Sequence, residues 1–369
     1  MKRIRFFINT LEAGGAEKVL VNLINVLPRD KFYITLVTIS GGTFVKDLPN
    51  WINYRQIMND NNSILSKLLK KIVYHLPRVI FNYIFLNGEY DYEIAFMHGY
   101  PTKIMNYKCK NKSDKTKVYA FVHSNLMANN TISSLYRNIN ECIAEYKQFD
   151  KVCFVSKMAM DGFFKKFGLL NNAIIIHNII DCSNIIEKSH IKSVIKFTTN
   201  GLKIITVGRL NKVKAFDRLI RISQKLEDIY EFEIIIVGEG DEKINLQKLI
   251  NDLKVHSVKL VGFHKNPYCI IKQADIYICS SITEGYSTSV SEAIVLGKPV
   301  LTTNCAGMDE ILDNGKFGII CNNNEESLLE KLEMILKNQQ ILNKYIKNIQ
   351  CIQNNISNKS KIGDYSKIL

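Results

Sequence analysis

Two carboxylates eight residues apart flank a glycine- and serine-rich turn in residues 283–293 (TEGYSTSVSEA). The turn follows a predicted buried strand over 275–279 and leads into a predicted helix, so Glu284 is expected on a loop and Glu292 near the first helical turns. A carboxylate in that position can accept a pair of hydrogen bonds from a cis-diol such as a ribose. The backbone N–H groups of residues 285–287 are expected to be available for hydroxyls or phosphate.

A purely structural interpretation of Glu292 stays open. Residues 289–292 (SVSE) fit a capping box, in which Glu292 would only bond back to the start of its own helix.

A cationic pair follows another predicted strand. Arg209 lies in the stretch Val207-Gly208-Arg209-Leu210, and Lys214 comes five residues after it. Open α/β sheets bind ligands at the carboxyl ends of their strands, and an Arg fork with a Lys point charge can neutralise a diphosphate. Lys212 competes for the same role, and two solvated surface cations are the alternative.

A third element is the glycine pair in residues 9–17 (NTLEAGGAE), between a predicted strand over 4–8 and a predicted helix over 16–27. Paired glycines let the backbone approach a ligand, and a helix N-terminus favours an anion. A plain tight turn is the alternative.

Alternating strands and helices position these residues in both halves of the chain. The second half has predicted strands at 203–207, 233–237, 258–261, 275–279, 300–303 and 318–321, separated by predicted helices at 218–226, 244–253, 291–296 and 326–336. This order predicts doubly wound α/β domains with mostly parallel sheets. The polar stretch 184–201 is the expected boundary between them.

Composition excludes several classes of protein. The 369 residues suit two domains, and 46% hydrophobic residues suit packed ones. Nine cysteines without a C-x-x-C pair argue against a disulfide-stapled or zinc-ribbon protein and favour the cytosol. The apolar runs are too short to span a membrane, and no signal peptide is expected. We also expect no nucleic acid, because no stacking motif accompanies the net charge of +14.

The positive charge is concentrated in the first half, where residues 1–180 hold 24 Lys and Arg against 13 Asp and Glu. Within it, residues 64–76 repeat apolar side chains on one helical face and carry Lys67, Lys70 and Lys71 on the rest. Such a helix suits an anionic membrane surface. The alternative is a helix that packs its apolar side on its own sheet.

Together these residues resemble the retaining GT-B glycosyltransferases of the large "group 1" family (family 4), which move a sugar from a nucleotide sugar. The matching elements run in family order over nearly the whole chain: Gly14-Gly15-Ala16-Glu17, His123, Ser156, Asn178 with Asp181, Gly208-Arg209-Leu210 with Lys214, Gly238-Glu239-Gly240, Glu284 with Glu292, Gly297-Lys298-Pro299, and Gly307 with Glu310.

The resemblance implies two Rossmann-like domains facing across a cleft. Residues 1–182 would bind the acceptor and residues 183–354 the nucleotide sugar, with a helix at about 355–369 packing back on the first domain. Four residues would act at the reacting centre: Glu284, His123, Arg209 and Lys214. The donor would also contact Gly15, Gly208, Gly285, Tyr286, Ser287, Thr288 and Glu292.

In such enzymes Arg and Lys replace a metal, so neither a metal nor another cofactor is expected. Some positions depart from the family pattern. Ala215 stands where glycine is common, which would shift the phosphate loop slightly, and Tyr286 replaces a commoner Phe. His123 alone would suit a structural histidine, and His98 is expected at the rim without a role.

The function expected from the resemblance is transfer of a hexose or N-acetylhexosamine, from UDP above all, to a glycan or polyprenyl-diphosphate-linked glycan. The product would be capsule, O-antigen or lipopolysaccharide. The enzyme would be cytoplasmic, peripheral on the inner leaflet of the cell membrane. The alternatives are a GT-B-fold sugar-nucleotide epimerase, a phosphorylase, and a catalytically degenerate sugar-binding module.

Overall fold

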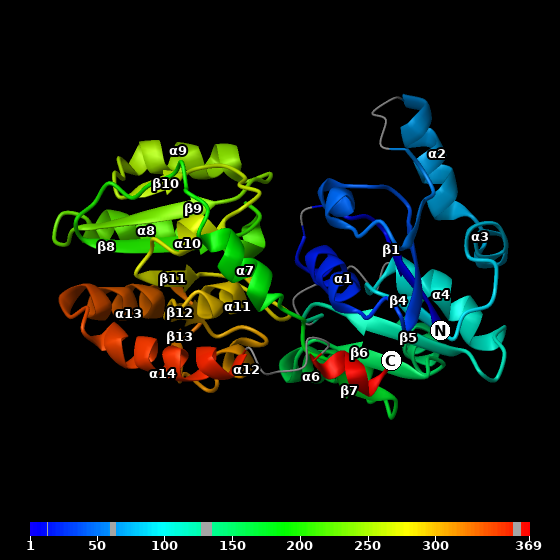
Figure 1. Cartoon of the computed structure of the whole chain (residues 1–369). Coiled ribbons are helices and arrows are strands. Elements are labelled where there is room, and N and C mark those ends of the chain that lie inside the picture. The colour runs from blue at the N-terminus through cyan, green and yellow to red at the C-terminus, as the bar shows by residue number, and fades with distance from the viewer. Residues whose placement is uncertain (13, 60–63, 127–134, 357–362) are drawn as a thin grey trace. The chain divides into compact units, whose positions relative to one another are not determined.

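The computed structural model describes residues 1–12, 14–59, 64–126, 135–356 and 363–369 of the chain (Figure 1). The chain forms two compact units, Met1–Ile179 with Lys361–Leu369, and Ile180–Ser360. Each unit is a parallel sheet with helices on both faces, as the alternation of strands and helices predicts. The prediction of two Rossmann-like domains is thereby confirmed.

The first unit has a seven-stranded sheet in the order β3-β2-β1-β4-β5-β6-β7. Its elements are β1 (Lys2–Ile8), α1 (Gly15–Val26), β2 (Phe32–Thr38), η1 (Thr43–Asp47), β3 (Asn53–Gln56), α2 (Ile64–His75), α3 (Arg78–Phe85), β4 (Tyr92–Ala95), α4 (Tyr100–Lys110), β5 (Lys117–Val122), α5 (Ile139–Tyr146), β6 (Lys151–Phe154), α6 (Lys157–Phe167), β7 (Ala173–Ile175) and η4 (Gly363–Lys367).

The end of the chain belongs to this first unit. Tyr365 of η4 is buried and stacks on Phe121 of β5 at 5.7 Å between ring centroids. Asp364 Oδ2 lies 2.7 Å from Nδ1 of His177. A single helix over 355–369 is not what the structure has. Residues 355 and 356 of the expected helix are the last residues of α14 (Ile341–Ile356). Residues 357–362 lie outside the described part, and η4 is a 3₁₀ turn.

The second unit has a six-stranded sheet in the order β10-β9-β8-β11-β12-β13. Its other elements precede α14: α7 (Cys182–Ser189), β8 (Leu202–Val207), η3 (Lys212–Lys214), α8 (Phe216–Leu226), β9 (Phe232–Val237), α9 (Lys243–Leu253), β10 (Val258–Leu260), α10 (Tyr268–Ile271), β11 (Ile276–Cys279), α11 (Thr288–Val295), β12 (Val300–Thr303), α12 (Met308–Ile311), β13 (Gly318–Cys321) and α13 (Glu325–Lys337).

Strand β9 shows why this unit folds as three layers. Its apolar run buries Ile234 and Ile236 in one hydrophobic cluster and Ile235 and Val237 in another. Successive side chains of a strand point to opposite faces, so a continuous apolar run needs helices on both. Helices α8, α9 and α13 cover one face, and α7, α10, α11 and α12 cover the other.

Helix α7 covers the start of the polar stretch that we expected to join the domains. Asp181 caps it, because its Oδ1 accepts a hydrogen bond of 3.2 Å from the backbone N of Asn184. The units divide between Ile179 and Ile180, before this cap.

Helix α2 projects from the sheet of the first unit and continues into α3 (Figure 1). Most of the repeating apolar residues of α2 face solvent, with Leu65 65% and Ile72 51% exposed, whereas Val73 packs against the core. The interpretation of α2 as a helix that packs its apolar side on its own sheet is therefore wrong for most of that face. Among the helices of the described residues, none is long and apolar enough to cross a bilayer.

Candidate active site

The charged residues singled out by sequence follow strands β8 and β11, which are neighbours in the second sheet. The chain leaves β8 toward β9 on one side of the sheet and later adds β11, β12 and β13 on the other. Ligands of open α/β sheets bind at such a switch point, outside the carboxyl ends of the strands. Arg209 and Lys214 come after β8, and Glu284 and Glu292 come after β11.

Lys214 and Glu284 form the centre of this cluster. The Nζ of Lys214 lies 2.6 Å from Oε1 of Glu284, and the hydroxyl of Ser281 donates a hydrogen bond of 2.6 Å to the same oxygen. Burial alone would lower the pKa of Lys214, but the carboxylate of Glu284 outweighs it and raises that pKa above its usual range. Lys214 is thus a shielded, charged ammonium and not a solvated surface cation.

Local backbone geometry gives Lys214 this position. The Oδ1 of Asn211 caps η3 by accepting a hydrogen bond from the backbone N of Lys214. Gly208 leaves room for the lysine side chain, because a Cβ there would lie only 3.0 Å from Cε of Lys214. Ala215 then adopts the left-handed conformation, with φ 48°, that favours glycine. The substitution of the usual glycine thus keeps the turn at some cost in strain.

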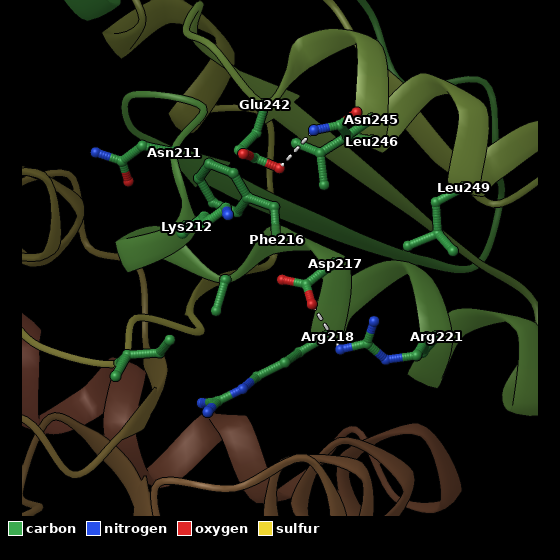
Figure 2. Close-up of a pocket in the computed structure, with 12 residues that line it drawn as sticks. Asn211, Lys212, Phe216, Asp217, Arg218, Arg221, Glu242, Asn245, Leu246 and Leu249 are labelled. Carbon is green, nitrogen blue, oxygen red and sulfur yellow. Dashed lines mark hydrogen bonds and ion pairs between the residues drawn. The ribbon is translucent and has the colours of Figure 1, made fainter.

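Lys212 lines a pocket that Lys214 does not line. A pocket of about 550 Å³ opens beside η3, between the starts of α8 and α9 (Figure 2). Lys212 and Arg218 line this pocket, whereas Lys214 and Glu284 do not. In Figure 2 the carboxylate of Asp217 is paired with Arg221, at 2.6 Å. Lys214 is thus the cation of this loop that contacts Glu284, and its role at a diphosphate, for which Lys212 competes, stays a prediction.

Helix α11 begins earlier than its sequence pattern suggests. Its N-cap is Ser287, whose hydroxyl accepts a hydrogen bond of 3.5 Å from the backbone N of Val290. Glu292 lies one turn further along, so the capping-box interpretation with Ser289 as the cap is wrong. The Glu292 side chain is buried, and the hydroxyl of Tyr268 donates to its Oε1 at 3.5 Å.

The turn before α11 carries the other predicted contacts. Gly285 and Ser287 are buried, while Thr288 is the first residue of the helix. Tyr286 is half-buried and packs against the core beneath α11. Arg209 is exposed on the loop after β8.

Gly15 and His123 belong to the first unit. Gly15 opens helix α1 after the N-cap Gly14, where a Cβ would collide with the carboxylate of Glu17. His123 follows β5, and its ring centroid lies 4.9 Å from that of Phe96 and 5.8 Å from that of Phe121. Both ring nitrogens of His123 are shielded from solvent.

His98, expected at the rim without a role, lies near His123 in the first unit. Its Nε2 lies 3.2 Å from the hydroxyl of Ser124. Burial lowers the pKa of His98 to about 4, and burial with the nearby His98 lowers the pKa of His123 to about 3. Both imidazoles are therefore neutral at pH 7, and suit hydrogen bonds to hydroxyls better than binding of an anion.

The two depressed histidine pKa values predict an acid-sensitive fold. Between pH 6.5 and about 4 the unfolded chain binds protons that the folded chain does not, so stability is lost as the pH falls through this window. Urea unfolding at pH 7, 6 and 5 measures this loss. It should be smaller in His123→Asn and in His98→Asn than in wild type. Replacing the exposed His190 by Asn should leave the pH dependence as it is, and equal slopes in all four proteins would refute the assignment.

Sequence reasoning missed Tyr268 and Ser281, the hydroxyls that contact Glu292 and Glu284. Ser281 stands two residues after β11, where a polar residue at a strand end is a usable signal. Tyr268 carries no comparable signal, because it begins the short helix α10, 24 residues before its partner. Among the described residues, no group of three or more His, Cys, Asp and Glu side chains is placed to hold a metal ion.

Comparisons with known proteins point to one enzyme class. Residues 187–351 match the family described as "Glycosyl transferases group 1". The chain is 26% identical over 363 residues, 94% of this chain and 93% of the other, to N-acetylgalactosamine-N,N'-diacetylbacillosaminyl-diphospho-undecaprenol 4-alpha-N-acetylgalactosaminyltransferase of Campylobacter jejuni. It is 30% identical over 168 residues, 45% of this chain and 46% of the other, to the O-antigen biosynthesis glycosyltransferase WclY of Escherichia coli.

A solved structure shows the same fold over nearly the whole length. The Anabaena protein Alr3699/HepE, crystallised in complex with UDP-glucose, is similar with a TM-score of 0.74 and 18% identity, covering 96% of this chain and 95% of that one. With the charged cluster at the β8–β11 switch point, these likenesses identify the chain as a glycosyltransferase with the GT-B fold, of which residues 187–351 match the group 1 family.

Proposed function

We propose that this enzyme is a retaining, metal-independent transferase that moves a hexose or N-acetylhexosamine from a UDP-sugar to a lipid-linked glycan. The product would be a cell-surface polysaccharide such as capsule, O-antigen or lipopolysaccharide. The observation that carries the proposal is the Lys214–Glu284 ion pair at the carboxyl edge of one parallel sheet, with the buried Glu292 on the helix that follows the Glu284 turn.

For the donor, each charged group of the cluster has a chemical role. Lys214 and Arg209 would neutralise the diphosphate, and Glu292 would accept hydrogen bonds from the ribose hydroxyls. Glu284 and the turn after it would hold the transferred sugar. Breaking the anomeric C–O bond leaves negative charge on the nucleoside diphosphate, which fixed cations stabilise without a metal. A UDP-glucose complex in the similar Anabaena structure supports the choice of UDP.

The surroundings of Glu284 favour a same-face displacement over a covalent intermediate as the route to the proposed retention. Its Oε1 already receives the ammonium of Lys214 and the hydroxyl of Ser281, which makes this carboxylate a weak nucleophile. A covalent glycosyl-enzyme intermediate would need a free carboxylate at the anomeric carbon. We therefore favour direct attack by the acceptor oxygen. The bond from the anomeric carbon to the diphosphate oxygen breaks, and the acceptor proton passes to that leaving phosphate.

For the acceptor, α2 and α3 offer a surface suited to an anionic membrane. Besides the exposed apolar residues of α2, four side chains of α3 are exposed: Val79, Ile80, Tyr83 and Ile84. The exposed Lys67, Lys70 and Lys71 lie among the apolar residues of α2. An apolar face with a lysine border matches the acyl boundary and the acidic headgroups of a bilayer. The Campylobacter relative is named for an undecaprenol-linked substrate, which supports action at the inner face of the membrane.

Removing the three lysines of α2 tests the membrane proposal. The variant with Lys67, Lys70 and Lys71 all changed to Gln should bind anionic vesicles at least tenfold more weakly, at about 1 kcal/mol per lysine. Co-sedimentation with vesicles of mixed phosphatidylglycerol and phosphatidylcholine measures this. A matched triple change of the exposed Lys248, Lys337 and Lys344 removes the same charge elsewhere and should have little effect. An equal loss of vesicle affinity in both variants would mean that only the net charge of the protein matters, and would contradict a membrane role for α2.

The donor proposal is tested by thermal unfolding with UDP, GDP, ADP or CMP in the presence of EDTA. A ligand at a hundred times its dissociation constant adds about 2.7 kcal/mol to the stability of the folded state. We expect a selective upward shift with UDP, and a further difference among UDP-sugars. A shift with another nucleotide alone, or only after a divalent cation is added, would contradict the proposal.

A further inference from the structure

The ladder between β8 and β11 is short at the switch point. Backbone pairing between the two strands joins Ile276 to Ile204 and Tyr277 to Ile205. On its other side β8 pairs with β9 as far as Val207. Because Gly208 N donates to Val237 O on β9, the preceding residue Val207 turns its own N–H and C=O toward β11.

The side chain of Tyr277 takes the place of the missing backbone pairing. Val207 N donates a hydrogen bond of 3.1 Å to the Tyr277 hydroxyl, and that hydroxyl donates one of 3.0 Å to Val207 O. One hydroxyl thus satisfies both polar groups of the last residue of β8. Tyr277 is 1% exposed, so removing its hydroxyl would leave buried polar groups of Val207 without a hydrogen bond, which costs stability.

A second side chain from the end of β11 holds the far end of the same loop. The hydroxyl of Ser280 donates a hydrogen bond of 2.8 Å to the backbone carbonyl of Lys214. Ser280 is buried. Residues 208–214, which carry Arg209 and Lys214, are therefore fixed at one end by Tyr277 and at the other by Ser280.

We propose that Tyr277 and Ser280 are positioning residues that hold the loop 208–214 in the geometry that binds the donor diphosphate. Neither is assigned a contact with the donor, and each acts through backbone groups of the loop. The inference rests on the proposed function, because it assigns the diphosphate to Arg209 and Lys214. It separates the phosphate part of the site from the part that holds the nucleoside, which lies with Glu292 on α11.

The test compares Tyr277→Phe with wild type and with Tyr230→Phe. The control removes a hydroxyl from the same unit, where Tyr230 donates to Glu333 away from the loop. Calorimetry measures the affinity for UDP, and competition measures that for uridine. We expect Tyr277→Phe to bind UDP five- to tenfold more weakly with uridine affinity within twofold of wild type, and Tyr230→Phe to change neither. A merely destabilised unit would lose affinity for both ligands together.

Hydrogen exchange gives a readout that does not depend on the ligand. The amide of Val207 should exchange faster in Tyr277→Phe than in wild type or Tyr230→Phe. Ser280→Ala should weaken UDP binding in the same selective way, and it serves if Tyr277→Phe fails to fold. Unchanged UDP affinity in a folded Tyr277→Phe or Ser280→Ala variant, or unchanged exchange at Val207 in a folded Tyr277→Phe variant, would overturn the inference. Failure of wild type to bind UDP would instead refute the donor assignment, and exchange at Val207 would still decide whether the hydroxyl holds the loop.

Discussion

Replacing Lys214 by Met should weaken UDP binding at least tenfold and lower kcat/KM by at least as much. The change removes the ammonium but keeps an unbranched side chain as far as the position of Cε, so the packing against Gly208 is retained. Loss of a charge-assisted contact to a diphosphate, in a partly buried site, corresponds to at least about 1.4 kcal/mol. Calorimetry with UDP and steady-state kinetics with the donor found in the thermal screen measure the two effects.

Stability and binding have to be separated in this variant, because Lys214→Met leaves the carboxylate of Glu284 without its ion-pair partner. The double variant with Glu284→Gln removes that unpaired charge, so it should regain thermal stability while UDP binding stays weak. Lys212→Met is the matched control two residues away, and a change below threefold is expected there. If the double variant regained UDP affinity together with stability, Lys214 would be a structural residue only.

The fold could be predicted from the sequence because its signals are local. Continuous apolar runs such as that of β9 need cover on both faces, and helical periods between them supply it. The start of α11 was misplaced because the serine- and threonine-rich turn offers several capping side chains, and only the backbone path selects Ser287. Periodicity likewise finds the apolar face of α2, but it cannot tell whether anything in the chain covers that face.

Parts of the site depended on contacts between distant residues. Spacing places Arg209, Lys212 and Lys214 on one loop, yet it cannot decide which cation meets Glu284, 70 residues away. The 3₁₀ turn η3 and the left-handed Ala215 settle this by separating the directions of Lys212 and Lys214. The hydroxyl of Tyr277 was hidden for another reason. An aromatic residue inside an apolar strand is ordinarily read as part of the core. Its hydroxyl can bond to Val207 only because the backbone pairing of β8 with β11 ends before that residue.

The second large effect is expected at Glu292, the carboxylate assigned to the ribose. Glu292→Gln keeps the shape of the side chain but removes its charge, so UDP binding should fall at least tenfold, or about 1.4 kcal/mol. The sharper measurement compares UDP with 2′-deoxy-UDP. Wild type should prefer UDP, because only the ribose offers both hydroxyls to the carboxylate. In Glu292→Gln most of that preference should disappear.

The matched control for this change is Glu233→Gln, since Glu233 is also a buried glutamate of the second unit. Glu233 lies near the start of β9, at the amino ends of the strands and so away from the charged cluster at their carboxyl ends. It accepts hydrogen bonds from Thr198. Glu233→Gln should leave both the UDP affinity and the preference over 2′-deoxy-UDP unchanged. A full preference for UDP in Glu292→Gln would move the ribose contact to another residue. The buried carboxylate beside Tyr268 would then be a structural element of α11, and the cations of the β8 loop would remain the part of the site that selects the donor.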